Sequence, residues 1–151
     1  MAKYMVRFSC GHSEEMELLG PIKIRTSRIR QYEKTGLCKN CYKAMKEAER
    51  KDLSKKAGKA FGEPPELKGS EKQVHWAVTL RQDFLNHAYT TAQKNGGTDS
   101  RTKDVVTWIL RAKTEARFWI DHREELMTDL FLSHCIREYL SQDTGSESRR
   151  R

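Results

Sequence analysis

The sequence has few cysteines, few prolines and no long apolar run. The cysteines and the absence of an apolar run bear on whether the protein is disulfide-bonded, secreted or inserted in a membrane. Its 151 residues include four cysteines and three prolines. No stretch approaches the roughly 20 apolar residues of a membrane-spanning helix, and the N-terminus lacks the apolar core of a signal peptide. A disulfide framework rarely has three clustered cysteines and a fourth one far away in an apolar stretch. We therefore expect a cytoplasmic protein that does not act in a membrane.

Common catalytic patterns are also missing. No Gly-rich phosphate loop follows a strand, and neither a serine elbow nor a metalloprotease helix occurs. The histidines beyond residue 70 are scattered over several predicted helices. We therefore expect no enzyme activity and assign no catalytic residue.

Charge is plentiful and unevenly distributed. Charged residues make up 33% of the sequence, and the formal net charge is +8. Residues 1–69 contain sixteen Lys and Arg against nine Asp and Glu, a balance of +7, whereas residues 70–151 have a balance of +1. The basic character therefore belongs to the N-terminal half, where it bears on the choice of partner.

Two short clusters in the first 41 residues have the spacing of metal ligands. Cys10 and His12 flank a glycine that permits a tight bend, and Cys38 and Cys41 form a C-x-x-C pair. Four nitrogen and sulfur donors in two clusters are the ligand set of a closed, structural Zn²⁺ site. We predict that Cys10, His12, Cys38 and Cys41 bind one structural zinc ion.

Two alternatives to this ligand set remain open at the level of sequence. Cys38 and Cys41 could form a redox pair, although the βαβ context of a thioredoxin-like motif is absent. His12 could be a surface histidine, in which case a carboxylate such as Glu14 or Glu15 would complete the site.

The N-terminal part is predicted to be a zinc ribbon over residues 1–45. Alternating apolar residues indicate a strand over residues 3–8, and a partner strand is expected around residues 16–19 before Gly20 and Pro21. A helix with a thin apolar stripe should follow from Cys41 to Ala60. Residues 46–69 are then a basic helix and a linker, the linker covering residues 62–69.

The segment between the two ligand pairs is basic, and its secondary structure is open between helix and strand. Either it faces phosphate or an acidic protein patch, or it is a solvated face around a small apolar seam. The residues of this candidate binding surface are Lys23, Arg25, Arg28, Arg30 and Lys34.

A helical domain is predicted over residues 70–140, followed by a flexible tail over residues 141–151. Ser70 and Gln73 fit a capping box at the start of the first helix, which should end at Asn95-Gly96-Gly97. Two further helices are expected over residues 103–120 and 123–140, and the three apolar stripes, tryptophans included, should share one core. The fold class is therefore α+β, a small β zinc ribbon followed by a mainly α-helical bundle.

Several segments together resemble a group of small zinc-ribbon proteins encoded by bacteria, phages and prophages. The resemblance covers most of the chain, and the combination of the ligand pairs with the Ser-Glu-Lys-Gln helix is its most specific part. His75 stands where the group more often has alanine, and residues 124–140 extend past the group's usual end. The segments are Cys10-Gly11-His12 with Gly20-Pro21, Leu37–Tyr42, Gly69–Ala77 and Phe118–Asp121 followed by Arg123.

This resemblance implies a metal-binding accessory role in a mobile element and no defined enzyme activity. Some small phage proteins of this general kind, zinc-containing ones among them, are anti-CRISPR proteins that inhibit a Cas9-type nuclease. We therefore expect a protein partner in the bacterial host cytoplasm. A CRISPR nuclease is the most specific candidate for this partner. The alternative is a zinc-ribbon protein that binds nucleic acid through its basic N-terminal half. A metal-dependent hydrolase would need an open position on the metal, which four protein ligands do not leave.

Overall fold

A computed structural model describes residues 2–147, with side chains described through Gln142. The chain divides into two compact units, Met1–Lys51 and Asp52–Arg151. A two-stranded antiparallel sheet precedes six helices, which confirms the α+β class and the helical C-terminal part. The basic tip at residues 149–151, part of the predicted flexible tail, lies outside the described residues.

The first unit opens with a β-hairpin. Strand β1 (Ala2–Arg7) pairs antiparallel with β2 (Ser13–Leu18), in a register that sets Val6 opposite Glu14 and Tyr4 opposite Met16. Side chains alternate between the faces of a strand, so Tyr4 and Val6 share one face with Phe8 just beyond the strand. Val6 and Phe8 are buried, which makes this face the inner one.

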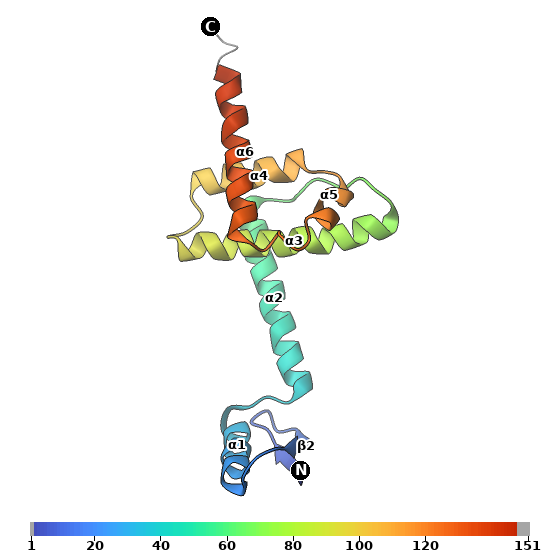
Figure 1. The fold of residues 1–151 in the computed structure, drawn as a ribbon, viewed down its shortest axis with the longest axis vertical. Helices are drawn as coiled ribbons and strands as arrows, with labels where there is room; N and C mark the ends of the chain where they lie inside the picture. The colour runs from blue at the N-terminus through green and yellow to red at the C-terminus, as the bar shows by residue number, and fades with distance from the viewer. Residues whose placement is uncertain (1, 148–151) are drawn as a thin grey trace. The chain divides into compact units, whose positions relative to one another are not determined.

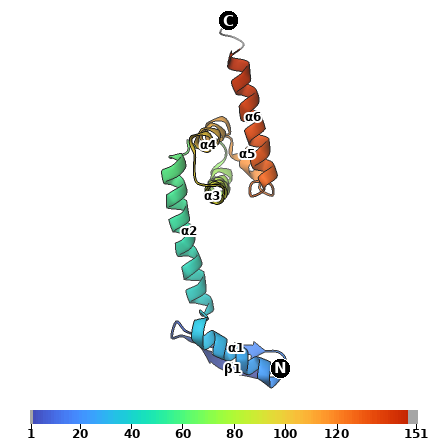
Figure 2. The ribbon, with the colours of Figure 1, turned by 90° about the vertical axis from the view of Figure 1, so that its left-hand side faces the viewer.

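Helix α1 (Ile22–Thr35) covers that inner face and resolves the open choice at residues 22–34 in favour of helix. Pro21 stands immediately before its first residue, and Ile29 and Tyr32 are spaced to lie on one side of it. Tyr32 packs on Phe8 with ring centroids 5.6 Å apart, and Figure 2 shows α1 lying along β1. The small core of this unit is Val6, Phe8 and Cys38, with α1 as one wall.

Helix α2 (Lys39–Phe61) begins in the first unit and ends in the second. Its apolar stripe is thin, as predicted: Tyr42 and Met45 are exposed, and only Ala57 and Phe61 are buried. Those two residues belong to the core of the second unit.

Helix α3 (Glu71–Lys94) has the predicted start and stop. Gln73 N–H donates to Ser70 Oγ and the Gln73 amide oxygen accepts from Ser70 N–H, so the capping box is confirmed. The helix ends one residue before Asn95, and Gly97 N–H returns to the carbonyl oxygen of Ala92. Positive φ angles at Gly96 and Gly97 explain why glycine occupies this turn.

The core of the second unit is built around Trp119. This side chain is fully buried, packs against Phe84 in a tilted arrangement with ring centroids 5.5 Å apart, and donates its indole N–H to the carbonyl oxygen of Lys113 at 2.9 Å. Helices α4 (Ser100–Ala112), α5 (Ala116–Asp121) and α6 (Asp129–Glu147) enclose it with α3, and Figures 1 and 2 both show α3 beside α4. One apolar core therefore serves all of these helices.

The predicted single helix over residues 103–120 is wrong, because the chain breaks it between α4 and α5. Lys113 leaves the helical conformation, with φ −107° and ψ 70°. Lys68 N–H then donates to the carbonyl oxygen of Thr114, and Ala116 N–H donates to that of Lys68, both at 2.8 Å. The predicted linker supplies Lys68, so its end is tied into the second unit rather than free.

The last helix and two side chains also differ from prediction. Helix α6 begins at Asp129 instead of Arg123 and continues to Glu147, past residue 140 where the sequence pattern ended it. Trp76 and Val78 are 48% and 44% exposed, so neither belongs to the core. The buried stripe of α3 instead includes Arg81, which donates to the carbonyl oxygen of Pro65 at 2.6 Å; burial lowers the pKa of its guanidinium.

Among the described residues, no helix combines the length and apolar character needed to cross a bilayer.

Candidate metal centre

The first ligand pair lies on the turn of the hairpin. Phe8 N–H donates to the carbonyl oxygen of His12 at 2.8 Å, and Gly11 N–H donates to that of Phe8 at 2.9 Å. Gly11 has a φ of +86°, a conformation in which a side chain would be strained. This tight turn projects Cys10 and His12 from the same end of the hairpin.

The second ligand pair lies at the start of α2, and Cys38 is the N-cap residue of that helix. Cys38 directly precedes the helix; its carbonyl oxygen accepts from Tyr42 N–H at 2.9 Å, and its Sγ accepts from Cys41 N–H at 3.4 Å. Helix N-termini favour negative charge because their amides point outward. The second ligand pair therefore lies where the helix N-terminus would stabilise the net negative charge of a metal–thiolate group.

The four donors meet at distances that suit a tetrahedral ion. The ligand atoms of Cys10, His12, Cys38 and Cys41 all lie within 4.8 Å of one another. Nδ1 of His12 is 3.7 Å from Sγ of Cys38 and 3.4 Å from Sγ of Cys41. Zinc bonded tetrahedrally to nitrogen and sulfur at ordinary lengths would hold them about 3.5 Å apart. The arrangement can hold a metal ion such as zinc.

The pKa values of the Cys10 and Cys41 thiols are shifted in opposite directions when no metal is bound. The N–H of Cys38, which points at Sγ of Cys10 at 3.4 Å, lowers the pKa of the Cys10 thiol to about 6. Hydrogen bonding with the Cys38 thiol and desolvation raise the pKa of Cys41 to about 11. Crowded thiols resist simultaneous ionisation without a compensating charge, and a coordinated dication supplies that charge.

The two pairs are joined by a contact that sequence reasoning missed. Ser9 donates its hydroxyl to the carbonyl oxygen of Gly36 at 2.6 Å, and its N–H bonds the same oxygen at 3.0 Å. Gly36 follows α1 and stands two residues before Cys38. Ser9 therefore fixes the spacing between the hairpin turn and the C-x-x-C pair. A serine next to a ligand cysteine is the only sequence signal of this support.

The structure also bears on the two alternatives to the predicted set. His12, and neither Glu14 nor Glu15, belongs to the group of converging donors. Glu15 instead lies on the outer strand face, 3.7 Å from the Lys3 ammonium. All four cysteines are free thiols, and Cys135 is buried in the separate core of the second unit. Within the described residues, no second group of three or more such donors converges.

Helix α1 places the five residues of the candidate basic surface on different sides of the helix. Lys23, Arg30 and Lys34 are exposed and, at intervals of seven and four residues, lie along one side of the helix. Arg28 is exposed on another side. Arg25 turns towards the sheet, where its guanidinium lies 5.7 Å from the centre of the Tyr4 ring. The five predicted residues are therefore not one surface.

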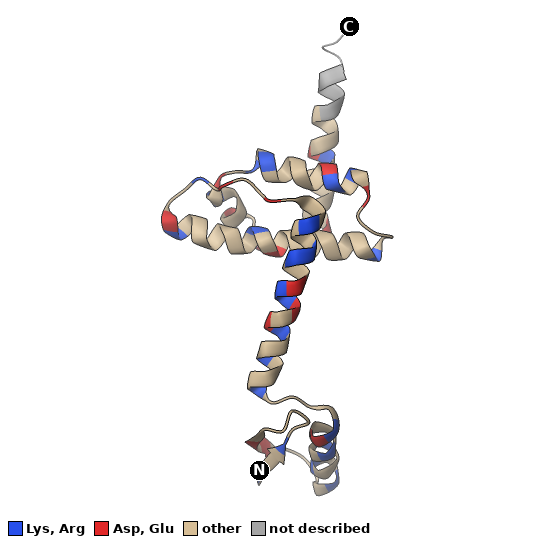
Figure 3. Ribbon diagram, turned by 180° about the vertical axis from the view of Figure 1, so that it is seen from behind, with Lys and Arg blue, Asp and Glu red and all other residues tan. Residues whose placement is uncertain are grey.

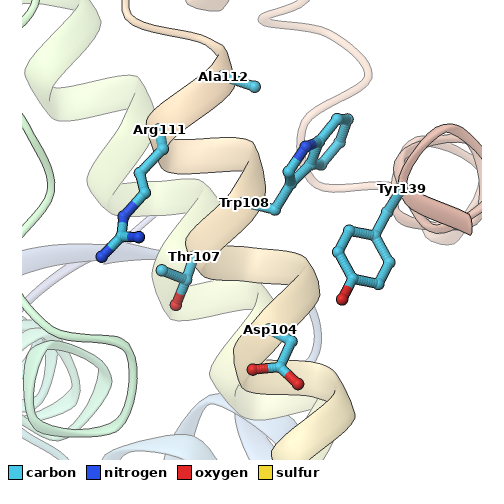
Figure 4. Close-up of a pocket in the computed structure, with 6 residues that line it drawn as sticks. All are labelled: Asp104, Thr107, Trp108, Arg111, Ala112 and Tyr139. Atoms are coloured by element: carbon cyan, nitrogen blue, oxygen red, sulfur yellow. The ribbon is translucent and has the colours of Figure 1, made fainter. Parts of the chain in front are cut away.

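The second unit has an open cleft of ≈ 630 Å³ that does not resemble a catalytic site. Trp108 points towards Tyr139, with ring centroids 5.8 Å apart, whereas Arg111 and Thr107 extend on the opposite side of α4 (Figure 4). Polar groups that do not converge cannot act together on one substrate.

Comparison of the chain with protein families, with curated proteins and with solved structures returns no match.

Proposed function

We propose that the chain is a non-catalytic zinc-binding protein that acts by binding a macromolecular partner. The observation that carries the proposal is the convergence of one imidazole and three thiols within 4.8 Å. Four protein ligands fill the tetrahedral shell of zinc, and an ion without an open position serves structure rather than catalysis. The zinc-ribbon character of residues 1–45 belongs to the same proposal.

Metal content tests the first half of the proposal. Protein purified without chelator should contain about one zinc ion per chain by elemental analysis. The double variant Cys38→Ser/Cys41→Ser should contain almost none. Cys135→Ala is the matched control, because it removes a thiol from the other core and should keep full occupancy. Absence of zinc from the wild-type protein would refute the assignment.

The partner we propose is a protein. In its most specific form, the proposal is that this chain is a phage or prophage product that inhibits a Cas9-type nuclease in the bacterial cytoplasm. Two points support a protein partner. One is the resemblance to small zinc-ribbon proteins of mobile elements. The other is the set of large apolar side chains exposed in the first unit, among them Ile22 at 71% and Leu19 at 62%, since apolar anchors are characteristic of protein interfaces.

A stoichiometric titration tests this form. Increasing amounts of zinc-loaded protein are added to a Cas9–guide complex before target DNA, and cleavage is followed. Inhibition should saturate near an equimolar ratio and should persist when excess competitor nucleic acid is added. An unchanged cleavage rate at high molar excess would exclude the nuclease as partner.

Nucleic acid is the second candidate, favoured by the basic side of α1. Binding through phosphates would be independent of sequence and would weaken steeply with salt, because each neutralised phosphate releases counterions. Electrophoretic titration with duplex DNA and single-stranded RNA distinguishes the two candidates. Tight binding at physiological salt, without any effect on the nuclease, would favour nucleic acid.

A further inference from the structure

The basic side chains along one side of α1 have no acidic partners in the part of the chain that the structure describes. Lys23, Arg30 and Lys34 are exposed, and none of them forms an ion pair with any of the described residues. Glu33 is the one acid in residues 22–35. We call Lys23, Arg30 and Lys34 the α1 stripe.

Helix α2 is also basic and contains seven lysines, some of which have acidic partners. Three of them pair with acids three or four residues away, which solvated helices commonly do. In Figure 3, α1 is mainly blue among its charged residues, whereas α2 carries a mixture of blue and red. The α2 pairs are Lys46–Glu49 at 3.0 Å, Lys51–Glu47 at 4.0 Å and Lys56–Asp52 at 2.6 Å. All three cations of the α1 stripe therefore lack an ion pair among the described residues, whereas acids one helical turn away neutralise part of the lysine charge of α2.

Apolar side chains adjoin the start of the stripe. Leu19, Ile22 and Ile24 are 62%, 71% and 47% exposed and stand within six residues of one another at the junction of β2 and α1. We call these three residues the 19–24 corner. Exposed large apolar residues gathered beside unpaired charge are the composition of an interaction surface.

We propose that the α1 stripe and the 19–24 corner bind an acidic protein segment that carries apolar side chains. Its carboxylates would pair with the stripe, and its apolar residues would cover the corner. This inference rests on the proposed function and specifies the chemistry of the protein partner. Charge complementarity selects an acidic partner, and the corner selects one with apolar anchors.

Two other anionic partners fit these observations less well. A nucleic acid gains from cations and from exposed aromatic rings, but the aromatic ring of α1, that of Tyr32, packs on Phe8. Exposed isoleucines add nothing to phosphate contacts. A lipid surface takes up a helix by one continuous apolar face, and on α1 the face with Ile29 and Tyr32 is already packed in the core.

The test measures binding of the zinc-loaded full chain to four probes by fluorescence anisotropy or vesicle sedimentation. The first probe is a labelled peptide of Glu residues interspersed with Leu, and the second replaces each Leu by Ser. The third is duplex DNA, and the fourth is phosphatidylcholine vesicles containing phosphatidylserine. The Leu-containing peptide should bind most tightly at physiological salt. Tighter binding of DNA or vesicles, or no binding of the peptide, overturns the proposal.

Variants locate the binding surface. Lys23→Glu/Arg30→Glu/Lys34→Glu should weaken peptide binding by about tenfold or more. The control Lys43→Glu/Lys55→Glu/Lys72→Glu makes the same charge change at other exposed lysines and should stay within about twofold of wild type. Ile22→Ser/Ile24→Ser should abolish the preference for the Leu peptide over the Ser peptide. Equal losses in the stripe and control variants would show nonspecific charge attraction and overturn the proposal.

The same variants separate this inference from the proposed function. Zinc content and circular dichroism are measured first for each variant, so that a folding defect is recognised. If the wild-type protein inhibits the nuclease and the stripe variant inhibits it equally well, the inference fails and the function stands. If the wild-type protein contains zinc but binds neither nuclease nor peptide, both the protein partner and this surface are wrong.

Discussion

Nδ1 of His12 lies 3.4 Å from Sγ of Cys41, although the two residues are 29 positions apart in the sequence. The hairpin turn carries the first residue and the first turn of α2 carries the second. Helix α1 lies between them in the chain, and its end is bonded to Ser9 beside the turn. Formation of the four-donor group therefore requires the whole first unit to fold, so a metal bound there would couple its binding to folding.

Removal of zinc should affect the two units unequally. The core of the first unit is small, Val6, Phe8 and Cys38, and one of these is itself a donor. The core of the second unit contains Trp119, Phe84 and Ile109 and shares no residue with the metal group. Chelation should therefore loosen residues 1–51 while most of the helical circular dichroism remains. Hydrogen exchange locates the loss, and collapse of the entire helical signal would show one cooperative unit.

Substitution of Gly36 should damage the metal centre without touching a ligand. An added Cβ would lie 2.7 Å from Tyr32 Cα and 2.9 Å from its carbonyl oxygen, and backbone atoms cannot move aside cheaply. We expect Gly36→Ala to lower the free energy of unfolding of the first unit by about 1–3 kcal/mol and to weaken zinc retention against a chelator.

Gly58→Ala is the control for that variant. A Cβ at Gly58, inside α2, meets nothing within 4 Å. Alanine should stabilise the helix by about 0.5–1 kcal/mol and leave zinc retention unchanged. Equal zinc retention in the two variants would show that the contact between Gly36 and Tyr32 does not hold the second ligand pair in place.

Replacement of Trp119, the fully buried tryptophan, and of Trp76, the most exposed one, should differ strongly in its effect on the free energy of unfolding. Trp119→Ala removes a fully buried ring and its hydrogen bond to Lys113, and should cost about 3–5 kcal/mol. Trp76 is 48% exposed and has Arg123 5.9 Å from its ring centre, so Trp76→Ala should cost about 1 kcal/mol or less. Urea unfolding of both variants measures the difference; similar losses would contradict the burial pattern.

Cys135 should resist modification until the second unit unfolds. Burial, reinforced by the charge of Glu138, raises the pKa of this thiol to about 11. The unfolded thiol ionises at its usual lower pKa and loses its proton first, so the stability of the folded state falls as the pH rises towards about 11.

Alkylation measures this protection. Zinc-loaded protein treated with iodoacetamide at mildly alkaline pH should remain unmodified at Cys135 by mass spectrometry, whereas protein in urea should react quickly, because the thiolate is the nucleophile. Rapid labelling of the native protein would show that the pocket around Cys135 opens readily.

Local sequence signals were sufficient for the features that depend on neighbouring residues. Three features each involve residues that are close together in the sequence. They are the two ligand pairs, Cys10 with His12 and Cys38 with Cys41, the capping box at Ser70, and the helix stop at Asn95-Gly96-Gly97. Capping and turn formation are short-range interactions between side chain and backbone, so their signatures are readable in the chain itself.

Tertiary structure decided the features that depend on residues distant in the chain. The backbone of Lys68 bonds Thr114 inside the break at residues 113–115 and Ala116 just after it, and these bonds replace those of the predicted continuous helix. Packing against β1 made residues 22–34 a helix and turned Arg25 away from Lys23, Arg30 and Lys34. Sequence by itself determined which donors could bind zinc and where the charge lies. The folded chain decided which of those charges pair, because helical spacing allows a pair without ensuring it: lysines of α2 pair with acids three or four residues away, whereas Arg30 forms no ion pair with Glu33 at the same spacing.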